Sequence, residues 1–262
     1  MYSSYEALKL EMRGATLWIT LDNPPVNANT PELHTELARV FGDVSRDPAV
    51  RCVVLTGAGE TFSAGGDISR MVKSLDDHTH WLKSMPEARQ IVLGMLDCEK
   101  PIVGRINGHA LGLGATLALC CDITVIVETA KIADTHVKIG LAAGDGGALL
   151  WPHLVGWAVA KRYLLTGDIL TGREAADIGL VGEAVPREEL DAAVGAWVAK
   201  LETGATKAIA ATKRALNMTL REQAETYMDA HLGLETMTQL SNDHREAVFA
   251  FRDKRKPEFK GD

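Results

Sequence analysis

The chain has little of what marks a membrane, secreted or nucleic-acid-binding protein. Its longest nearly apolar run, residues 108–121, spans about fourteen residues, whereas a transmembrane helix needs about 20. The first fourteen residues hold no basic segment followed by an apolar block, so we expect no secretory signal. Lys and Arg number 28 against 35 Asp and Glu, and the net charge of −7 argues against a nucleic-acid or anionic-membrane partner.

Cysteine is also scarce, and it lacks the spacing of a metal site. The four cysteines lie in apolar surroundings without a C-x-x-C or Cys/His pattern, at Cys52, Cys98, Cys120 and Cys121. They are typical of buried free thiols in a reducing compartment, so we expect a cytoplasmic protein without a metal centre. An acidic and histidine cluster at residues 76–80 could ligate a metal, but the absence of an apolar frame nearby favours a solvated loop.

The residues that are present predict one globular domain of α/β class. With 262 residues and 46% hydrophobic content, the chain can bury a core without a disulfide or metal. Two strands are predicted at 15–22 and 51–56, with a helix between them that begins after Thr30 and Pro31. A second cycle places a strand at 101–107, a buried helix at 113–121 and a strand at 123–127. From residue 149 the sequence turns helical, with segments that include 187–201, 207–220 and 243–254.

Two glycine-rich segments follow predicted strands, at 61–67 and 107–114. The dinucleotide fingerprint G-x-G-x-x-G, the phosphate loop and the G-x-S-x-G elbow are all absent from the chain. Glycine lets backbone N–H groups approach a ligand closely, and a following helix adds a dipole that favours negative charge. The two segments are therefore either tight turns of the fold or, if they converge, an oxyanion hole in which each donor is worth about 3–4 kcal/mol.

Six strings along the chain resemble the crotonase (enoyl-CoA hydratase/isomerase) superfamily in order and spacing. They are NPPVNAN (23–29), FSAGGDI (62–68), INGHALGLGATLALCCDI (106–123), GLAAGDGG (140–147), LLTGDILTGREAADIGLVGEAVP (164–186) and FRDKRKPEF (251–259). The resemblance implies a crotonase-like spiral of ββα units over residues 1–200 and a C-terminal helical trimerisation region over 201–262. It also implies a homotrimer or dimer of trimers and an acyl-CoA substrate, with CoA as part of the substrate and no separate cofactor.

The resemblance assigns roles to individual residues. Gly66 and Leu113 would supply the two N–H donors that hold an enolate oxygen. The CoA moiety would lie on Asn27, Ala28, Ala64, Gly65, Asp67 and Ile68. At the C-terminus, Phe251 would cover the adenine and Lys254 would hold a phosphate, although the basic cluster there could also be a solvated helix end.

The catalytic positions depart from the family pattern. Typical hydratases carry two Glu residues on either side of one water, and this sequence has Thr116 and His136 at those positions. A hydroxyl cannot act unaided as a general acid or base, so the two-Glu mechanism is excluded. We expect His136, as a neutral imidazole base, to pair with Asp145 nine residues later. The alternative is that His136 binds backbone and Asp145 caps a helix.

The spacing of His136 and Asp145 resembles that of the 6-oxocamphor hydrolase branch, which cleaves cyclic β-diketones. His34 also falls where that branch has a histidine, but the branch has another histidine at Leu113 and lacks the AGGD loop. The sequence thus favours an acyl-CoA hydratase or isomerase that uses His136 and Asp145. A CoA-independent β-diketone hydrolase and a non-catalytic acyl-CoA binder remain alternatives, and an aspartate nucleophile as in the family's dehalogenases is disfavoured by the loop spacing.

Overall fold

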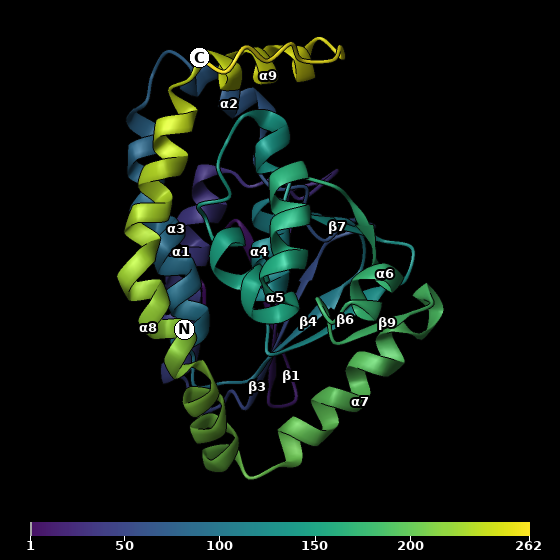
Figure 1. Ribbon diagram of the computed structural model, residues 1–262. Coiled ribbons are helices and arrows are strands. Elements are labelled where there is room, and N and C mark those ends of the chain that lie inside the picture. Colours follow the sequence, from purple (N-terminus) through teal and green to yellow (C-terminus); the bar gives the residue numbers. More distant parts are fainter. Residues whose placement is uncertain (1) are drawn as a thin grey trace.

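A computed structural model describes residues 2–262. A six-stranded sheet has the order β1-β2-β3-β4-β6-β9, in which β1 is antiparallel to β2 and the others are parallel (Figure 1). Its strands are β1 (Leu8–Arg13), β2 (Thr16–Leu21), β3 (Cys52–Gly57), β4 (Ile102–Ile106), β6 (Ile123–Val127) and β9 (Glu183–Val185). Every residue of β3 is buried, as expected for a parallel strand that is covered on both faces.

A second, smaller sheet pairs β5 (Ala110–Leu111), β7 (Lys131–Ala133) and β8 (Leu170–Thr171). The strands predicted at 15–22, 51–56, 101–107 and 123–127 all match strands of the large sheet to within a residue or two at each end. Strand β5 lies within the second glycine-rich segment and joins this segment to the smaller sheet. Helix α4 (Leu113–Leu119) begins two residues after the end of β5.

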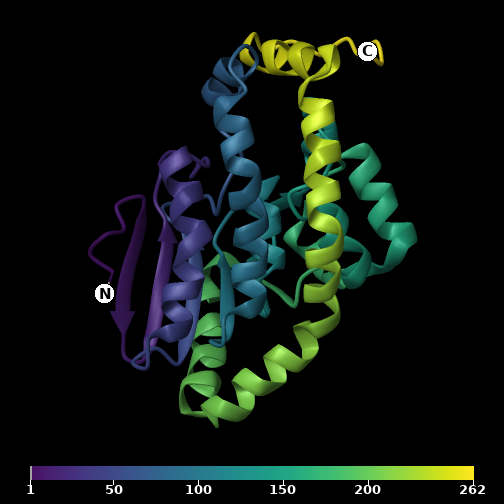
Figure 2. The same ribbon diagram turned by 90° about the vertical axis from the view of Figure 1, so that its left-hand side faces the viewer.

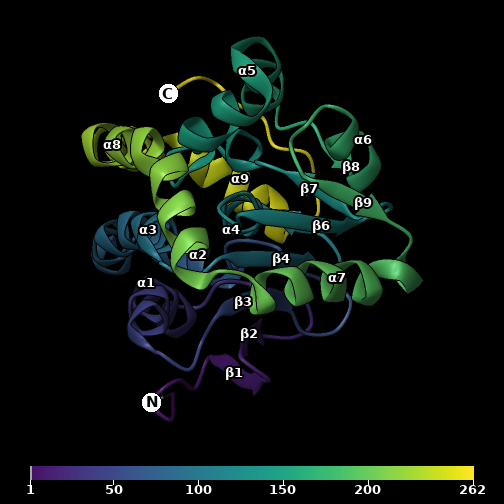
Figure 3. The ribbon, with the colours of Figure 1, turned by 90° about the horizontal axis from the view of Figure 1, so that it is seen from below.

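Three long helices, α1 (Pro31–Arg46), α3 (Thr79–Asp97) and α8 (Thr206–Gln239), pack next to one another along one side of the molecule (Figure 2). Seen from below, α7 (Leu190–Thr203) runs along the large sheet and contacts β3, β4 and β6 (Figure 3). Helix α1 begins as predicted, because the Thr30 hydroxyl accepts a hydrogen bond from the Leu33 N–H at 3.2 Å.

The remaining helices surround the glycine-rich segments. They are α2 (Ile68–Ser74), α4, α5 (Gly147–Thr166), α6 (Gly172–Asp177), α9 (Asn242–Arg252) and the short 3₁₀ turns η1 (His136–Ile139) and η2 (Arg187–Glu189). Helix α9 lies across one end of the molecule, against α2 and η1 (Figure 1). None of the helices in residues 2–262 is long and apolar enough to cross a bilayer.

Two local predictions were wrong. The helix predicted at 207–220 continues to Gln239, and α3 begins at Thr79, so His80 lies in a helix and not in a loop. Asp76 and Asp77 are exposed, and within residues 2–262 the 76–80 cluster does not gather three potential metal ligands. The predicted boundary between residues 200 and 201 falls in the last turn of α7.

Polar contacts along its length hold helix α8 against the rest of the protein. The buried Lys213 ammonium lies 2.7 Å from the Asp122 carboxylate and donates to the Lys100 carbonyl at 3.0 Å. Further along, the Trp81 indole N–H donates to the Thr236 hydroxyl at 3.0 Å. Away from these contacts α8 exposes large apolar side chains, among them Leu216, Met218, Tyr227, Leu234 and Met237. Association of these faces into a trimer stays a prediction.

Candidate active site

The two glycine-rich segments meet face to face at one edge of the smaller sheet. The Leu111 N–H donates to the Ser63 carbonyl at 3.0 Å, and Ser63 and Ala110 form a parallel bridge. Gly65 has φ of +79°, and a side chain there would overlap the Leu111 carbonyl oxygen, so the approach requires glycine. The two segments therefore converge, which is the arrangement that the second of the two interpretations of the sequence requires.

Two backbone N–H groups are left free at this junction. Leu113 is the first residue of α4, where helix geometry provides no intrahelical acceptor. Gly66 follows the strand-like contact in which Asn29 donates to the Gly65 carbonyl at 2.7 Å. Across residues 2–262, neither the Gly66 N–H nor the Leu113 N–H donates to another protein group. Both residues face the same cavity, where their N–H groups could hold an anionic oxygen.

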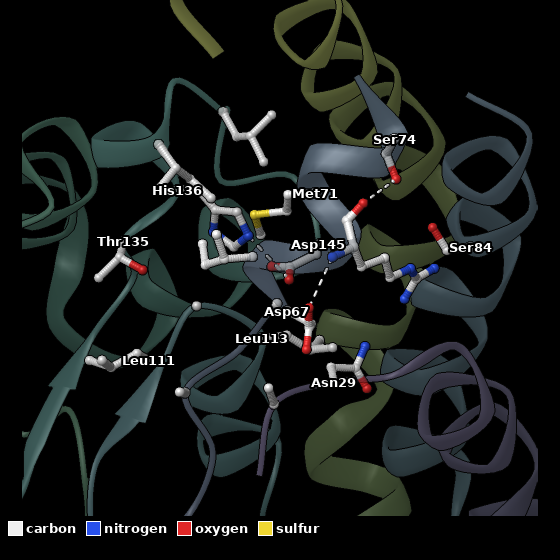
Figure 4. Close-up of a pocket in the computed structure, with 18 of the residues that line it drawn as sticks. Asn29, Asp67, Met71, Ser74, Ser84, Leu111, Leu113, Thr135, His136 and Asp145 are labelled. Atoms are coloured by element: carbon white, nitrogen blue, oxygen red, sulfur yellow. Dashed lines mark hydrogen bonds and ion pairs between the residues drawn. The ribbon is translucent and has the colours of Figure 1, made fainter. Parts of the chain in front are cut away.

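The cavity has a volume of about 720 Å³ and lies between α2, α3, the glycine junction, η1 and α8. Figure 4 shows His136, Thr135 and Leu111 on one side of it and Ser74, Ser84 and Asn29 on the other. Most of the predicted site residues line it, namely Ala28, His34, Ala64, Gly66, Asp67, Ile68, Leu113, His136, Asp145 and Phe251. Asn27, Gly65, Thr116 and Lys254 do not.

Asn27 is a structural residue and does not face the cavity, in contrast to the prediction of a CoA contact. Its side chain is fully buried, and its amide donates to the carbonyls of Ala58 and Thr61 at 2.9 and 2.7 Å. Its side-chain oxygen accepts from the Asn23 N–H, and its own φ is +50°, a conformation that asparagine tolerates. Asn27 thus fixes the loop that leads into the AGGD segment.

Thr116 and Lys254 also lie outside the cavity lining. The Thr116 hydroxyl, on α4, donates to Asp145 Oδ1 at 3.1 Å, so it orients a carboxylate and contacts no bound acyl group directly. Lys254 is exposed just beyond the end of α9, while Phe251 on that helix is at the rim of the cavity.

His136 lies between two carboxylates, and not in a simple pair with Asp145. Its Nδ1 is 2.7 Å from Asp134 Oδ1, and its Nε2 is 3.4 Å from Asp145 Oδ2. The predicted pairing of His136 with Asp145 therefore describes only one of the two ring nitrogens, because Asp134 holds the other. The ring lies against the glycine junction, since a Cβ at Gly112 would be 3.8 Å from His136 Cε1.

The charges of the cluster favour an imidazolium. Burial alone lowers the pKa of His136, but the carboxylates of Asp145 and Asp134 more than reverse this and raise its pKa well above the usual value. Burial likewise raises the pKa of Asp145, yet the charge on His136 and the Thr116 hydroxyl leave it below its ordinary value. These directions favour a protonated His136 next to an ionised Asp145 at neutral pH, a state in which His136 can donate a proton, whereas the sequence led us to expect a neutral base.

A third carboxyl group, that of Glu235 on α8, completes the cluster. Glu235 Oε1 is 4.0 Å from His136 Nε2, and the buried Oε2 has no hydrogen-bond partner in the described chain. Burial raises the pKa of Glu235 to about 8, with the negative charges of Asp145 and Asp134 adding to the effect against the opposing charge of His136. Glu235 is therefore mostly a neutral acid at pH 7.

Replacing Glu235 by glutamine is expected to stabilise the protein at alkaline pH. Between pH 4.5 and 8 the folded protein retains a proton that the unfolded chain has released, so this group costs stability as pH rises. Glutamine has the shape of glutamate but does not ionise, so it removes this pH-dependent loss of stability. The melting temperature of Glu235→Gln should match wild type near pH 4 and exceed it by several degrees at pH 8. A difference independent of pH would show that Glu235 ionises normally.

Asp134, His136 and Asp145 each offer a ligand atom within 4.8 Å of the others. The two imidazole nitrogens, however, face different carboxylates, so a hydrogen bond to Asp134 and a charge pair with Asp145 hold the ring, while the buried Oδ2 of Asp134 has no hydrogen-bond partner in residues 2–262. We derive no metal chemistry from this cluster.

His34 forms a second carboxylate–histidine pair in the cavity wall. Its Nδ1 is 2.8 Å from Glu87 Oε2, and Glu87 Oε1 accepts from the Thr35 hydroxyl at 2.7 Å. Burial lowers the pKa of His34, the Glu87 carboxylate raises it and the Arg70 guanidinium lowers it further, with a net decrease. His34 is thus a neutral residue at the cavity and not a free surface side chain.

Sequence reasoning missed Asp134 and Glu235. Asp134 lies only two residues before His136 and could have been found as a polar residue at the end of a buried strand. Glu235 lies about one hundred residues further on, beyond the predicted end of its helix, so no local pattern connects it with His136.

Comparison with known proteins identifies the family. A family model described as enoyl-CoA hydratase/isomerase matches residues 11–262. The chain belongs to this family. The resemblance stated from the sequence, the α/β crotonase-like fold and the expectation of an enzyme are thereby confirmed.

Relatives of the chain carry several activities of this family. The 1,2-epoxyphenylacetyl-CoA isomerase of Escherichia coli is 32% identical over 93% of this chain and 94% of its own length. The (E)-benzylidenesuccinyl-CoA hydratase of Thauera aromatica is 32% identical, over 96% and 98%. A solved enoyl-CoA hydratase/isomerase from Mycobacterium paratuberculosis shares 36% identity and superposes with a TM-score of 0.89, over 93% of this chain and 97% of that one.

Proposed function

We propose that this enzyme adds water to, and removes water from, the double bond of an enoyl-CoA thioester, with His136 and Asp145 in place of two glutamates. The observation that carries the proposal is the buried His136–Asp145 contact beside two free N–H groups in one cavity. Hydration of a double bond needs a proton acceptor for the water and a proton donor for the carbon, and this contact supplies one of each.

The proposed hydration proceeds in balanced steps. Asp145 takes a proton from water while the water oxygen bonds to the β-carbon of the enoyl group. The electron pair of the double bond moves toward the thioester oxygen, and the N–H groups of Gly66 and Leu113 hold the resulting enolate. His136 then protonates the α-carbon, and Asp145 returns its proton to His136 across the contact of 3.4 Å.

The neighbouring residues keep this pair in its working state. Asp134 holds Nδ1 of His136, so Nε2 faces Asp145 and the substrate. Thr116 donates to Oδ1 of Asp145, so Oδ2, the oxygen that faces His136, is the one that takes the proton from water. Because Glu235 stays neutral, the cluster carries two negative charges and one positive charge.

The CoA-independent β-diketone hydrolase is the second candidate, favoured by the combination of His136, Asp145 and His34 in one cavity. It would have no use for a nucleotide site. We expect free CoA to raise the melting temperature, because a ligand that binds only the folded state stabilises it. Stabilisation by a cyclic β-diketone and none by CoA would reverse the order of the two candidates.

Lys254→Asn is expected to reduce the stabilisation by CoA without changing kcat. Asparagine accepts the φ of +54° at this position and removes the ammonium group together with most of its flexible stem. The Michaelis constant for an acyl-CoA should rise several-fold, because a phosphate contact contributes equally to ground-state and transition-state binding. Lys260→Asn, an exposed control beyond α9, should leave both quantities unchanged. An unchanged Michaelis constant in Lys254→Asn at low salt would exclude the contact.

A further inference from the structure

Arg70, on α2, is an unpaired cation in the wall of the cavity. The side chain is partly buried, and burial lowers the pKa of its guanidinium against the opposing fields of Glu87, Glu32 and Asp67. In the described residues 2–262, no side-chain nitrogen of Arg70 donates a hydrogen bond to the protein. No carboxylate reaches ion-pair distance either. A guanidinium has five N–H donors, so all of them remain available at this wall.

Two of the three acidic residues near Arg70, Glu87 and Asp67, have other partners. Both oxygens of Glu87 are engaged, by His34 and by Thr35, at 2.8 and 2.7 Å. Asp67 caps α2 by accepting from the backbone N–H of Arg70 at 2.9 Å and from the Ser69 hydroxyl. The negative charge of these carboxylates stabilises the Arg70 cation from a distance, but none of them forms an ion pair with it. The guanidinium can therefore bind an anion from outside the protein.

This part of the wall is separate from the reacting end. Figure 4 shows Ser74 and Ser84 across the cavity from His136. The Ser74 hydroxyl donates to the Arg70 carbonyl at 3.0 Å and the Ser84 hydroxyl donates to the Trp81 carbonyl at 2.8 Å, so the polar groups here belong to α2 and α3. A molecule with its reacting carbons at His136 could therefore place a second polar group at this end.

We propose that Arg70 binds a carboxylate at the distal end of the acyl group, and that the natural substrate is the CoA thioester of an unsaturated dicarboxylic acid. This inference rests on the proposed function. A guanidinium pairs with a carboxylate through two parallel hydrogen bonds, a geometry that lysine cannot reproduce. Hydrogen bonds to charged groups in a partly desolvated site are worth about 10- to 100-fold in affinity.

A phosphate of CoA is the other anion that Arg70 could meet. The family resemblance places the nucleotide against the C-terminal basic segment, residues 252–256. Arg252 and Arg255 there are already paired with Asp253 and Glu246. Arg70 faces a cavity also lined by Trp81, Met85 and Ala88, side chains suited to an acyl group. The apolar lining favours the acyl carboxylate over a phosphate.

The test compares two thioesters that differ by one carboxylate. Glutaconyl-CoA, crotonyl-CoA and free CoA are titrated by calorimetry into wild type, Arg70→Met and Lys73→Met. Lys73 is exposed on the same helix and outside the cavity lining, so Lys73→Met removes the same charge without touching the wall. Met at position 70 keeps the length of the apolar stem.

Wild type and Lys73→Met should bind glutaconyl-CoA at least ten-fold more tightly than crotonyl-CoA, and Arg70→Met should lose this preference. Affinities for crotonyl-CoA and free CoA should change less than two-fold in every variant. Equal affinities for the two thioesters in wild type would overturn the inference, as would an equal loss for all three ligands in Arg70→Met, which would indicate a phosphate contact. Titration does not depend on turnover, so a retained preference without hydration would refute only the proposed function. Failure to bind any CoA compound would refute both.

Discussion

Replacing His136 by glutamine is expected to lower kcat by about 10²- to 10⁴-fold, the usual contribution of a general acid or base. Glutamine keeps the size of the side chain and one N–H that can donate to Asp134, but it cannot transfer a proton. The affinity for free CoA should stay within a factor of two, because His136 lies at the reacting end of the cavity. Steady-state kinetics with crotonyl-CoA, together with circular dichroism to verify the fold, measures the effect.

The same pair should act as one unit. Asp145→Asn should lose less than His136→Gln, and the double variant should be scarcely worse than His136→Gln alone, because the two residues pass a single proton between them. The activity of wild type should be flat around neutral pH and fall at alkaline pH, where His136 and Glu235, whose pKa is about 8, lose their protons. Wild-type turnover in His136→Gln, or activity that rises through pH 8, would refute His136 as the proton donor.

Substituting Leu113 by proline is expected to lower kcat by about 10²- to 10³-fold. Proline removes one of the two N–H donors that would hold the enolate oxygen. Leu113 is the first residue of α4, the position at which proline fits best in a helix, so the fold should survive.

The matched control for this substitution is Leu113→Ala, which removes the same side chain but keeps the N–H. Its kcat should stay close to that of wild type, while its Michaelis constant rises as packing against the acyl group is lost. Equal losses of kcat in the proline and alanine variants would mean that Leu113 acts through its side chain and not through its N–H.

Much of the fold could be predicted, because its central strands are buried on both faces. Residues 52–57 read as a continuous apolar run for this reason, whereas β1 did not. Strand β1 is at the edge of the sheet, and its alternating Lys9, Glu11 and Arg13 are largely exposed, so it lacks the apolar composition of the inner strands. Helix α3 was not predicted, since its N-terminus has no capping side chain and its buried residues begin only at Ser84.

The glycine junction could be predicted because its geometry is local. Each segment follows a strand in the sequence. Close backbone contact requires glycine at positions such as Gly65, and these glycines are visible in the sequence. The charge state of His136 was not predictable in the same way. It depends on Asp134 at Nδ1 in addition to Asp145, and no local pattern connects the cluster with Glu235, which reaches the cavity only because α8 continues well past residue 220 and packs against α3. The sequence predicted one carboxyl group next to His136, and the fold places three there.

Incubation of the enzyme with crotonyl-CoA or glutaconyl-CoA in water labelled with heavy oxygen tests the central claim most directly. Mass spectrometry of the products should show a thioester that has gained one labelled water in wild type. His136→Gln, at equal concentration and time, should leave the starting thioester almost unchanged. The absence of labelled product from both thioesters, with cleavage of a cyclic β-diketone by the same preparation, would contradict the proposed hydration and assign the His136 cluster to carbon–carbon bond hydrolysis.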